Sequence, residues 1–203
     1  MVEMFQNGGD FMWPILILLI IGVGFSFERL WTLTRASVNT RKFLARLHNA
    51  LKEGGVDAAA TECENTPGPV ASILHAGLSR SSQGLDHVEK AISNAGSIEM
   101  AFLERGMLVL STVIVLAPML GFTGTVAGMV DAFDAIKKAN DISPAVVAGG
   151  ISKALLTTLF GLVVAMIIQA FYNYFTSRID KLIIDMEESS IELMDALVDM
   201  QDK

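Results

Sequence analysis

The sequence predicts an all-α integral membrane protein with three transmembrane helices, two of them extended into long cytoplasmic helices. Charged residues make up only 18% of the 203 residues, whereas a soluble domain carries about 25%. The shortfall is concentrated in three apolar windows, residues 13–31, 107–130 and 146–175. Basic residues gather on one side of these windows, which gives the chain a direction in the bilayer.

The first window is the shortest, and it needs Phe11 and Trp31 as interfacial ends to cross about 30 Å of hydrocarbon. Its N-terminal flank carries Glu3 and Asp10 but no Lys or Arg, and no small-residue cleavage site follows it. A retained helix is therefore expected, not a cleaved signal peptide.

The second window contains no charged side chain, and the third contains only Lys153. At about 1.5 Å per residue, both are long enough to span the bilayer. Pro118 lies inside the second window and removes a backbone hydrogen-bond donor, so a kink is expected there. The kink is expected to serve helix packing, with a moving hinge as the alternative.

The distribution of basic residues predicts the topology. None precedes the first window. Basic residues follow the first window, precede the second and follow the third: Arg35, Arg41, Lys42, Arg46 and Lys52, then Arg105, then Arg178 and Lys181. By the positive-inside rule, segment 1–12 and the connection 131–145 lie in the periplasm, and residues 32–106 and 176–203 lie in the cytoplasm. The expected location is a bacterial inner membrane.

The cytoplasmic segments are expected to be helical. Breaks are expected at Gly54-Gly55 and at Pro67-Gly68-Pro69. The helix over residues 86–104 is predicted to continue unbroken into the second membrane window.

The C-terminal tail carries apolar residues at helical spacing, with Ser190 as the one gap. This seam packs either on the chain's own 32–106 helices or on neighbouring subunits. Its members are Ile179, Ile183, Met186, Leu193, Leu197 and Met200.

Composition and motif content argue against several classes of function. The net charge of −7 disfavours a nucleic-acid partner. No catalytic acid–base pair, activated nucleophile or phosphate-binding glycine loop is present, so neither an enzyme nor a cofactor is expected. His48, His75 and His87 lack the spacing of metal ligands, so no metal is expected. The single Cys63 cannot form an internal disulfide and is expected in a reducing, cytoplasmic loop.

Small residues form one stripe on each of the last two membrane helices, and each stripe carries threonine. The stripes are Gly121, Gly124, Thr125, Gly128 and Ala132, and Gly150, Ala154, Thr157, Thr158, Gly161 and Ala165. One interpretation is helix packing, because small residues let membrane helices approach closely. The other is a central cavity in which threonine hydroxyls hold water or an ion. Both can apply in different parts of an assembly.

Neither stripe contains an acidic residue. Proton and ion pathways usually display Asp, Glu or His inside the membrane. If this protein moves protons, the titrating carboxylate must therefore come from another polypeptide, and the stripes would receive a partner helix.

Three groups of residues, one on each membrane helix, together resemble the ExbB/TolQ/MotA proton-channel family, and ExbB/TolQ more closely than MotA. They are Glu28-Arg29-Leu30, then Ala117-Pro118-Met119-Leu120-Gly121 with Gly124-Thr125-Val126, and finally Ile151 to Leu162 with Tyr172-Asn173. MotA-like members have four membrane helices, and this chain shows three.

The resemblance implies a homopentamer around a dimer of a single-helix partner of the ExbD/TolR type, which carries the membrane aspartate. It assigns the pore threonines to Thr125 and Thr158, with Thr157 beside them. It also implies that motion of the partner is passed to a periplasmic effector of the TonB/TolA type, as in TonB-dependent transport. The alternative is a non-conducting scaffold or signalling protein in the lipid bilayer whose small-residue faces serve only packing.

Lys153 departs from the family pattern, because many ExbB and TolQ members have glutamate at this position. The lysine either snorkels to the outer interface or pairs with a partner carboxylate. Threonine-lined sites also suit sodium, so both protons and sodium ions stay open as the transported ion.

Overall fold

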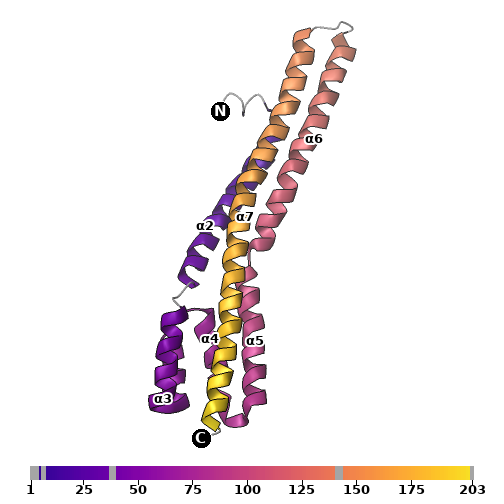
Figure 1. Cartoon of the computed structure of the whole chain (residues 1–203). Helices are drawn as coiled ribbons and strands as arrows, with labels where there is room; N and C mark the ends of the chain where they lie inside the picture. The colour runs from indigo at the N-terminus through magenta and orange to yellow at the C-terminus, as the bar shows by residue number, and fades with distance from the viewer. Residues whose placement is uncertain (1–4, 6–7, 37–39, 140–143, 202–203) are drawn as a thin grey trace. The chain divides into compact units, whose positions relative to one another are not determined.

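The computed structural model describes residues 5, 8–36, 40–139 and 144–201. Within these ranges the chain is helical and contains no strand (Figure 1). The elements are α2 (Met12–Ala36), α3 (Thr40–Glu64), α4 (Pro69–Leu78), the 3-10 helix η1 (Ser81–Gln83), α5 (Leu85–Glu104), α6 (Met107–Ala139) and α7 (Pro144–Gln201). Three helical stretches are long and apolar enough to cross a membrane, with their apolar windows in α2, α6 and α7. The predicted all-α membrane fold is confirmed.

The chain divides into two compact units. Unit 1 comprises Met1–Glu28 and Gly106–Tyr174, and unit 2 comprises Arg29–Arg105 and Phe175–Lys203. Unit 1 holds almost all of the apolar windows, and unit 2 holds the segments expected in the cytoplasm. Both α2 and α7 continue from one unit into the other as single helices.

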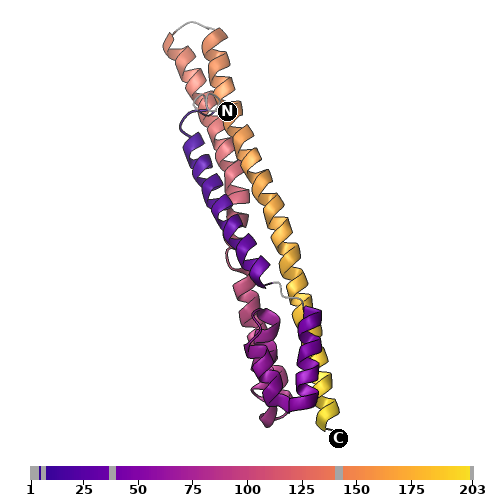
Figure 2. The ribbon, with the colours of Figure 1, turned by 90° about the vertical axis from the view of Figure 1, so that its left-hand side faces the viewer.

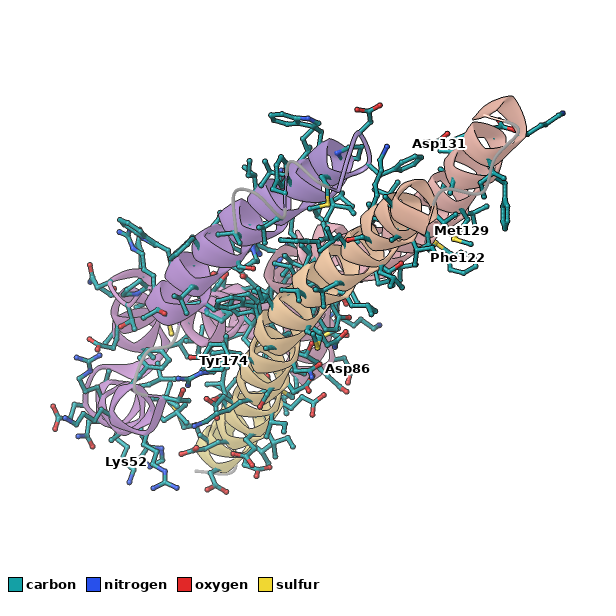
Figure 3. All side chains as sticks on the ribbon, turned by 90° about the horizontal axis from the view of Figure 1, so that it is seen from above. Lys52, Asp86, Phe122, Met129, Asp131 and Tyr174 are labelled. Carbon is teal, nitrogen blue, oxygen red and sulfur yellow. The ribbon has the colours of Figure 1, made fainter. Side chains whose placement is uncertain are left out.

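In unit 1, α6 and α7 run side by side (Figures 1 and 2). Helix α2 packs on both of them, because a Cβ built on Gly22 would lie 2.9 Å from Cγ1 of Ile168 and 3.3 Å from Cγ1 of Val113. Both of these side chains are buried. Phe122 of α6 instead projects outward (Figure 3) and is 68% exposed, as contact with lipid requires.

Unit 2 is built around α4, of which seven of the ten residues are buried. Helix α5 packs tightly on it, since a Cβ on Gly77 would lie 2.6 Å from Cγ1 of Ile92. The predicted break at Gly54-Gly55 is confirmed as a kink in α3, where Gly55 has a φ of 69°. The second predicted break is also confirmed, because α3 ends at Glu64 and α4 begins at Pro69.

The C-terminal part of α7 buries one face within unit 2, so packing on the chain's own helices is confirmed for most of the predicted seam. The buried residues are Ile179, Leu182, Met186, Ser189, Leu193 and Leu197. Two predicted members of this face are not buried: Ile183 is only partly buried and lines an open groove, and Met200 is 43% exposed. Ser189 lies in the middle of this buried face. Its hydroxyl donates to the carbonyl of Asp185 at 2.5 Å, so the buried hydroxyl of Ser189 has a hydrogen-bond partner.

One predicted helix is divided in the structure. The expectation that residues 86–104 continue unbroken into the second membrane window is wrong, because α5 ends at Glu104 and α6 begins at Met107. Between them Arg105 has a ψ of 129° and Gly106 a φ of 86°, a left-handed conformation that glycine adopts without a Cβ clash. At its other end α6 extends to Ala139, well past the apolar window, so Asp131 is helical.

The guanidinium of Arg29 is buried in unit 2, with the residue only 4% exposed. Its Nη1 donates to the carbonyl of Leu103 at 3.4 Å and to that of Phe102 at 3.5 Å. These carbonyls belong to the last turn of α5, where a helix carries a partial negative charge. Arg29 therefore ties α2 to the end of α5.

Cys63 lies in α3 and not in a loop, which corrects the sequence-based expectation. The residue is buried, at 3% exposure. Burial, reinforced by the neighbouring charge of Glu62, raises the pKa of the Cys63 thiol to about 12. The thiol is therefore neutral at physiological pH and unreactive.

Candidate functional site

The two small-residue stripes face each other across α6 and α7 of unit 1. A Cβ on Gly161 would lie 2.5 Å from the carbonyl oxygen of Ala117, and one on Gly121 would lie 2.9 Å from that of Thr157. A Cβ on Gly128 would lie 3.1 Å from the Cβ of Ala154. The backbones approach too closely for any larger side chain, which is the small-residue packing typical of membrane helices.

The close contact between α6 and α7 continues toward the C-terminal end of α6 and the N-terminal end of α7. A Cβ on Gly150 would overlap the Cβ of Ala132, and one on Gly124 would lie 2.6 Å from the Thr157 hydroxyl. Thus all six of the predicted packing glycines and alanine lie at this seam: Gly121, Gly124, Gly128, Gly150, Ala154 and Gly161. Pro118 is half-buried, and α6 continues through it.

Three threonine hydroxyls meet at the centre of the seam. The Thr125 and Thr158 hydroxyls are hydrogen-bonded to each other. The carbonyl of Gly121 accepts from Thr158 at 3.1 Å, from Thr125 at 3.2 Å and from Thr157 at 3.3 Å. The carbonyl of Ala154 is within 3.1 Å of Thr125 and 2.7 Å of Thr157. The structure thus brings the threonines of the two predicted stripes together.

In this threonine cluster (Thr125, Thr157 and Thr158), each hydroxyl has more than one hydrogen-bond acceptor within reach. A threonine hydroxyl carries one proton and two lone pairs. Thr125 can direct its proton to Gly121, to Ala154 or to the hydroxyl of Thr158, but only to one of them at a time. The cluster can therefore exchange donors with little rearrangement, and it offers free lone pairs to a water molecule or a cation.

The three threonines differ in accessibility. Thr157 is 1% exposed and is enclosed by the two helices. Thr125 and Thr158 are partly exposed, at the edge of the seam. Within one chain, Thr125 and Thr158 are therefore the members that can present a hydroxyl to another molecule.

A charged pair within the chain, which was not predicted, also joins α6 and α7. The Nζ of Lys153 in α7 is 3.7 Å from Oδ2 of Asp131 in α6. Lys153 was expected to snorkel or to pair with a carboxylate of another polypeptide, and in the structure it faces an acid of its own chain. The sequence offers little indication of this ion pair, because Asp131 lies one residue beyond the second apolar window and was assigned to a connecting loop.

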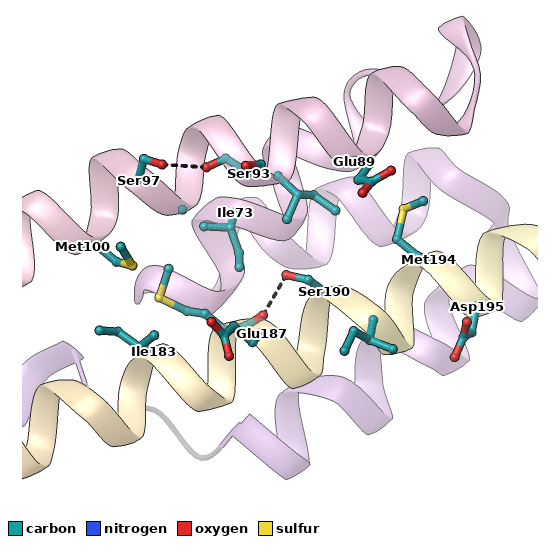
Figure 4. A pocket seen from close by; sticks show the side chains of 14 residues that line it. Ile73, Glu89, Ser93, Ser97, Met100, Ile183, Glu187, Ser190, Met194 and Asp195 are labelled. Atoms are coloured by element: carbon teal, nitrogen blue, oxygen red, sulfur yellow. Dashed lines mark hydrogen bonds between the residues drawn. The ribbon is translucent and has the colours of Figure 1, made fainter.

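Unit 2 contains a separate open groove of about 700 Å³ between α5 and α7 (Figure 4). Its floor is apolar and rich in methionine, with Met100, Met186 and Met194, and Glu89 and Glu187 stand among its lining residues. It holds no combination of groups suited to catalysis. Aliphatic and thioether side chains are typical of surfaces that bind other helices.

Comparison with known proteins gives three kinds of match. Residues 65–188 match the model of the MotA/TolQ/ExbB proton channel family. A putative biopolymer transport protein ExbB homolog of Methanothermobacter thermautotrophicus is 35% identical over 180 residues, which cover 88% of this chain and 64% of that protein. A putative ExbB-like protein 1 of Synechocystis is 30% identical, covering 82% of this chain and 66% of the relative. The chain thus spans about two thirds of the length of both relatives.

Among solved structures, the C. jejuni MotAB structure matches with a TM-score of 0.55 at 18% identity, covering 87% of this chain and 67% of the matched chain. That likeness concerns the fold. The family model covers more than half of this chain, and its matched region contains the threonine cluster and the seam. The chain is a multi-pass membrane protein that belongs to the MotA/TolQ/ExbB proton channel family.

Proposed function

We propose that this chain is the multi-helix stator and proton-channel subunit of an ion-driven motor in the bacterial inner membrane. Five copies would surround a dimer of a single-helix partner of the ExbD/TolR type. The chain would lie with its N-terminus in the periplasm and its C-terminus in the cytoplasm. The assembly would energise a periplasmic effector of the TonB/TolA type, and TonB-dependent transport is one such process.

The observation that carries this proposal is the threonine cluster, which lies within apolar windows that contain no carboxylate. Thr125 and Thr158 form a polar pair inside helices whose apolar windows contain no Asp or Glu. Hydroxyls solvate a proton carrier or a cation, but they do not titrate near neutral pH. A titrating carboxylate would come from the partner helix, which would dock beside Thr125 and Thr158.

Unpartnered apolar surface on unit 2 supports assembly with other chains. Ile184, Ile191 and Val198 of α7 recur every seven residues and are 52%, 63% and 41% exposed. This part of α7 is rich in Asp and Glu, so a lipid environment does not account for the exposed side chains. A heptad-spaced stripe of this kind fits a helix of a neighbouring subunit.

The proposed cycle uses charge neutralisation. A proton entering beside Thr125 and Thr158 would neutralise the partner's aspartate, which would then favour a different position of the partner helix. One elementary charge crossing 100 mV supplies about 2.3 kcal/mol, so a few protons suffice for a conformational stroke. Sodium ions are the alternative carrier.

A non-conducting scaffold is the second candidate, and the packing of the seam favours it. Thr157 is enclosed between α6 and α7, and the glycines serve contact between these two helices. In that case the threonines would stabilise the helix pair only. The two candidates differ in whether ion flux depends on Thr125 and Thr158.

The experiment is co-expression with a candidate protein that has one membrane helix bearing an aspartate, chosen from the neighbouring genes. Native mass spectrometry of the purified complex is expected to give five copies of this chain with two of the partner. Reconstituted complexes are expected to conduct protons or sodium ions, and an Asp→Asn change in the partner helix should abolish the flux. A chain that captures no such partner and conducts no ion would favour the scaffold.

A further inference from the structure

The charged pair of Asp131 and Lys153 lies at the same helix contact as the threonine cluster. Asp131 follows Thr125 by six positions, about 9 Å along α6, and Lys153 precedes Thr158 by five positions, about 7.5 Å along α7. Gly128 and Ala154 are in contact across the interval between the two polar groups. Among the described residues of α6 and α7, Asp131 and Lys153 are therefore the charged residues nearest along the helices to Thr125 and Thr158.

The side chain of Lys153 is held in place by a third segment. A Cβ on Gly9 would overlap Cε of Lys153 and lie 2.8 Å from its Nζ. Gly9 has a φ of 75°, so the backbone passes over the lysine in a conformation that favours glycine. The lysine side chain, 39% exposed, thus contacts the Gly9 backbone and lies within ion-pair distance of the carboxylate of Asp131.

An ammonium group at this distance would strongly affect the threonine cluster if it were alone. The separation of about 8 Å is close to the Debye length at physiological ionic strength, so salt screens the interaction only in part. A lone positive charge there repels an approaching cation, and neighbouring copies of the chain would add to the repulsion. A carboxylate 3.7 Å away cancels most of the long-range field of the lysine.

We infer that Asp131 is a positioning and charge-compensating residue: it neutralises Lys153 so that cations can reach the Thr125–Thr158 hydroxyls. Lys153 in turn holds the Asp131 carboxylate beside it. This inference rests on the proposed ion-conducting function and adds to it a determinant of which ions are admitted.

The test uses the complete complex with its single-helix partner, reconstituted in liposomes, with proton-sensitive and sodium-sensitive dyes and an imposed membrane potential. Asp131→Asn leaves Lys153 uncompensated and is expected to lower cation flux at least about tenfold. The double change Asp131→Asn with Lys153→Gln removes both charges and is expected to restore flux to within about threefold of the unmodified complex. The charge swap Asp131→Lys with Lys153→Asp is expected to restore it as well.

Asp134→Asn is the matched control, because Asp134 is also an exposed acid of α6, three residues further along. It is expected to leave flux unchanged. Complex yield and partner stoichiometry are measured for each variant, and the double change tests the inference even where the single variants assemble poorly.

The outcomes separate the two levels of the hypothesis. If the unmodified complex conducts neither ion, the proposed function fails and the inference fails with it. If the unmodified complex conducts and Asp131→Asn conducts equally well, the inference alone is wrong. It is also wrong if the double change conducts no better than Asp131→Asn, because Asp131 would then act independently of Lys153.

Discussion

The hydroxyl groups of Thr125 in α6 and Thr158 in α7 are hydrogen-bonded to each other, and the carbonyl of Gly121 accepts from both. This pair joins the two helices within their close small-residue contact, beside Gly121 and Gly124. A structural role and a conducting role predict different consequences when the hydroxyls are removed.

Replacing Thr125 or Thr158 with Val keeps the shape of the side chain and removes the hydroxyl. We expect ion-driven activity to fall at least about tenfold, whereas the stability of the helix pair should change by only about 0.5–1 kcal/mol, as for other hydrogen bonds between membrane helices. Thr→Ser at either position should retain activity. Ion flux and thermal unfolding are measured on the same preparations.

Thr123 provides the control for these variants. It is exposed, and its hydroxyl donates to the Met119 carbonyl of its own helix at 2.8 Å. Thr123→Val should therefore leave flux unchanged. Full activity of both Thr125→Val and Thr158→Val would contradict the conducting role and support the scaffold.

Gly161→Ala should destabilise unit 1 by about 1–3 kcal/mol, because the added methyl meets the Ala117 backbone, which cannot move aside as a side chain can. Gly149→Ala is the matched control in the same helix, since a Cβ there meets nothing within 4 Å. Alanine should be neutral at that position, or stabilising by up to about 1 kcal/mol. Unfolding midpoints in a mild detergent compare the two variants, and equal midpoints would show that the seam tolerates expansion.

Arg29→Gln should lower the stability of unit 2 by about 1.5–3 kcal/mol, because it removes charge-assisted hydrogen bonds from a buried guanidinium to the carbonyls at the end of α5. Arg35→Gln is the control from the same helix, because Arg35 is exposed. Limited proteolysis across the junction between α5 and α6 reports the difference. Faster cleavage is expected for Arg29→Gln alone, and indistinguishable cleavage of the two variants would argue against this anchoring role.

Cys63 should resist maleimide at neutral pH in the folded protein and react only after unfolding, because its thiol is buried and its pKa is raised to about 12. The folded state holds this proton more tightly than the unfolded state, in which the thiol has its ordinary pKa of 9.0. The stabilising contribution is therefore complete below pH 9.0 and is lost progressively as pH rises toward about 12.

Cys63→Ala removes this titration and serves as its reference. The difference in unfolding free energy between the unmodified chain and this variant should be constant near neutral pH and should shrink above pH 9.0. Rapid labelling of folded protein at neutral pH would show that the thiol is accessible.

Much of the fold follows from hydrophobic patterning, since three charge-poor windows allow little besides helices in a membrane. The kink at Gly55 and the turn before Pro69 were predictable for a local reason, because glycine and proline determine backbone geometry by themselves. The end of α5 at Glu104 was not predictable from the sequence. Gly106 lies within a helical pattern, and glycine is compatible both with continuing a helix and with the left-handed conformation that ends it.

The candidate site likewise has one feature that the sequence predicts and one that it does not. The threonine cluster could be predicted because Thr125, Thr157 and Thr158 share faces with glycines at helical spacing. The pairing of Asp131 with Lys153 could not, because it depends on how far α6 extends and on the register of α6 against α7. A sequence specifies which residues share a helix face, but the register between two helices is set by packing along their full length.

The uninterrupted course of α7 imposes a constraint on chain length. One residue added between Ile179 and Met186, inside unit 2, would rotate the rest of α7 by about 100° about the helix axis, so Met186, Leu193 and Leu197 would leave their buried positions. One residue added beside Gly106 would fall in non-helical backbone, where local dihedral changes can absorb it. Insertions and deletions should therefore be tolerated at the α5–α6 junction and rejected within α7, where the helical phase must be preserved.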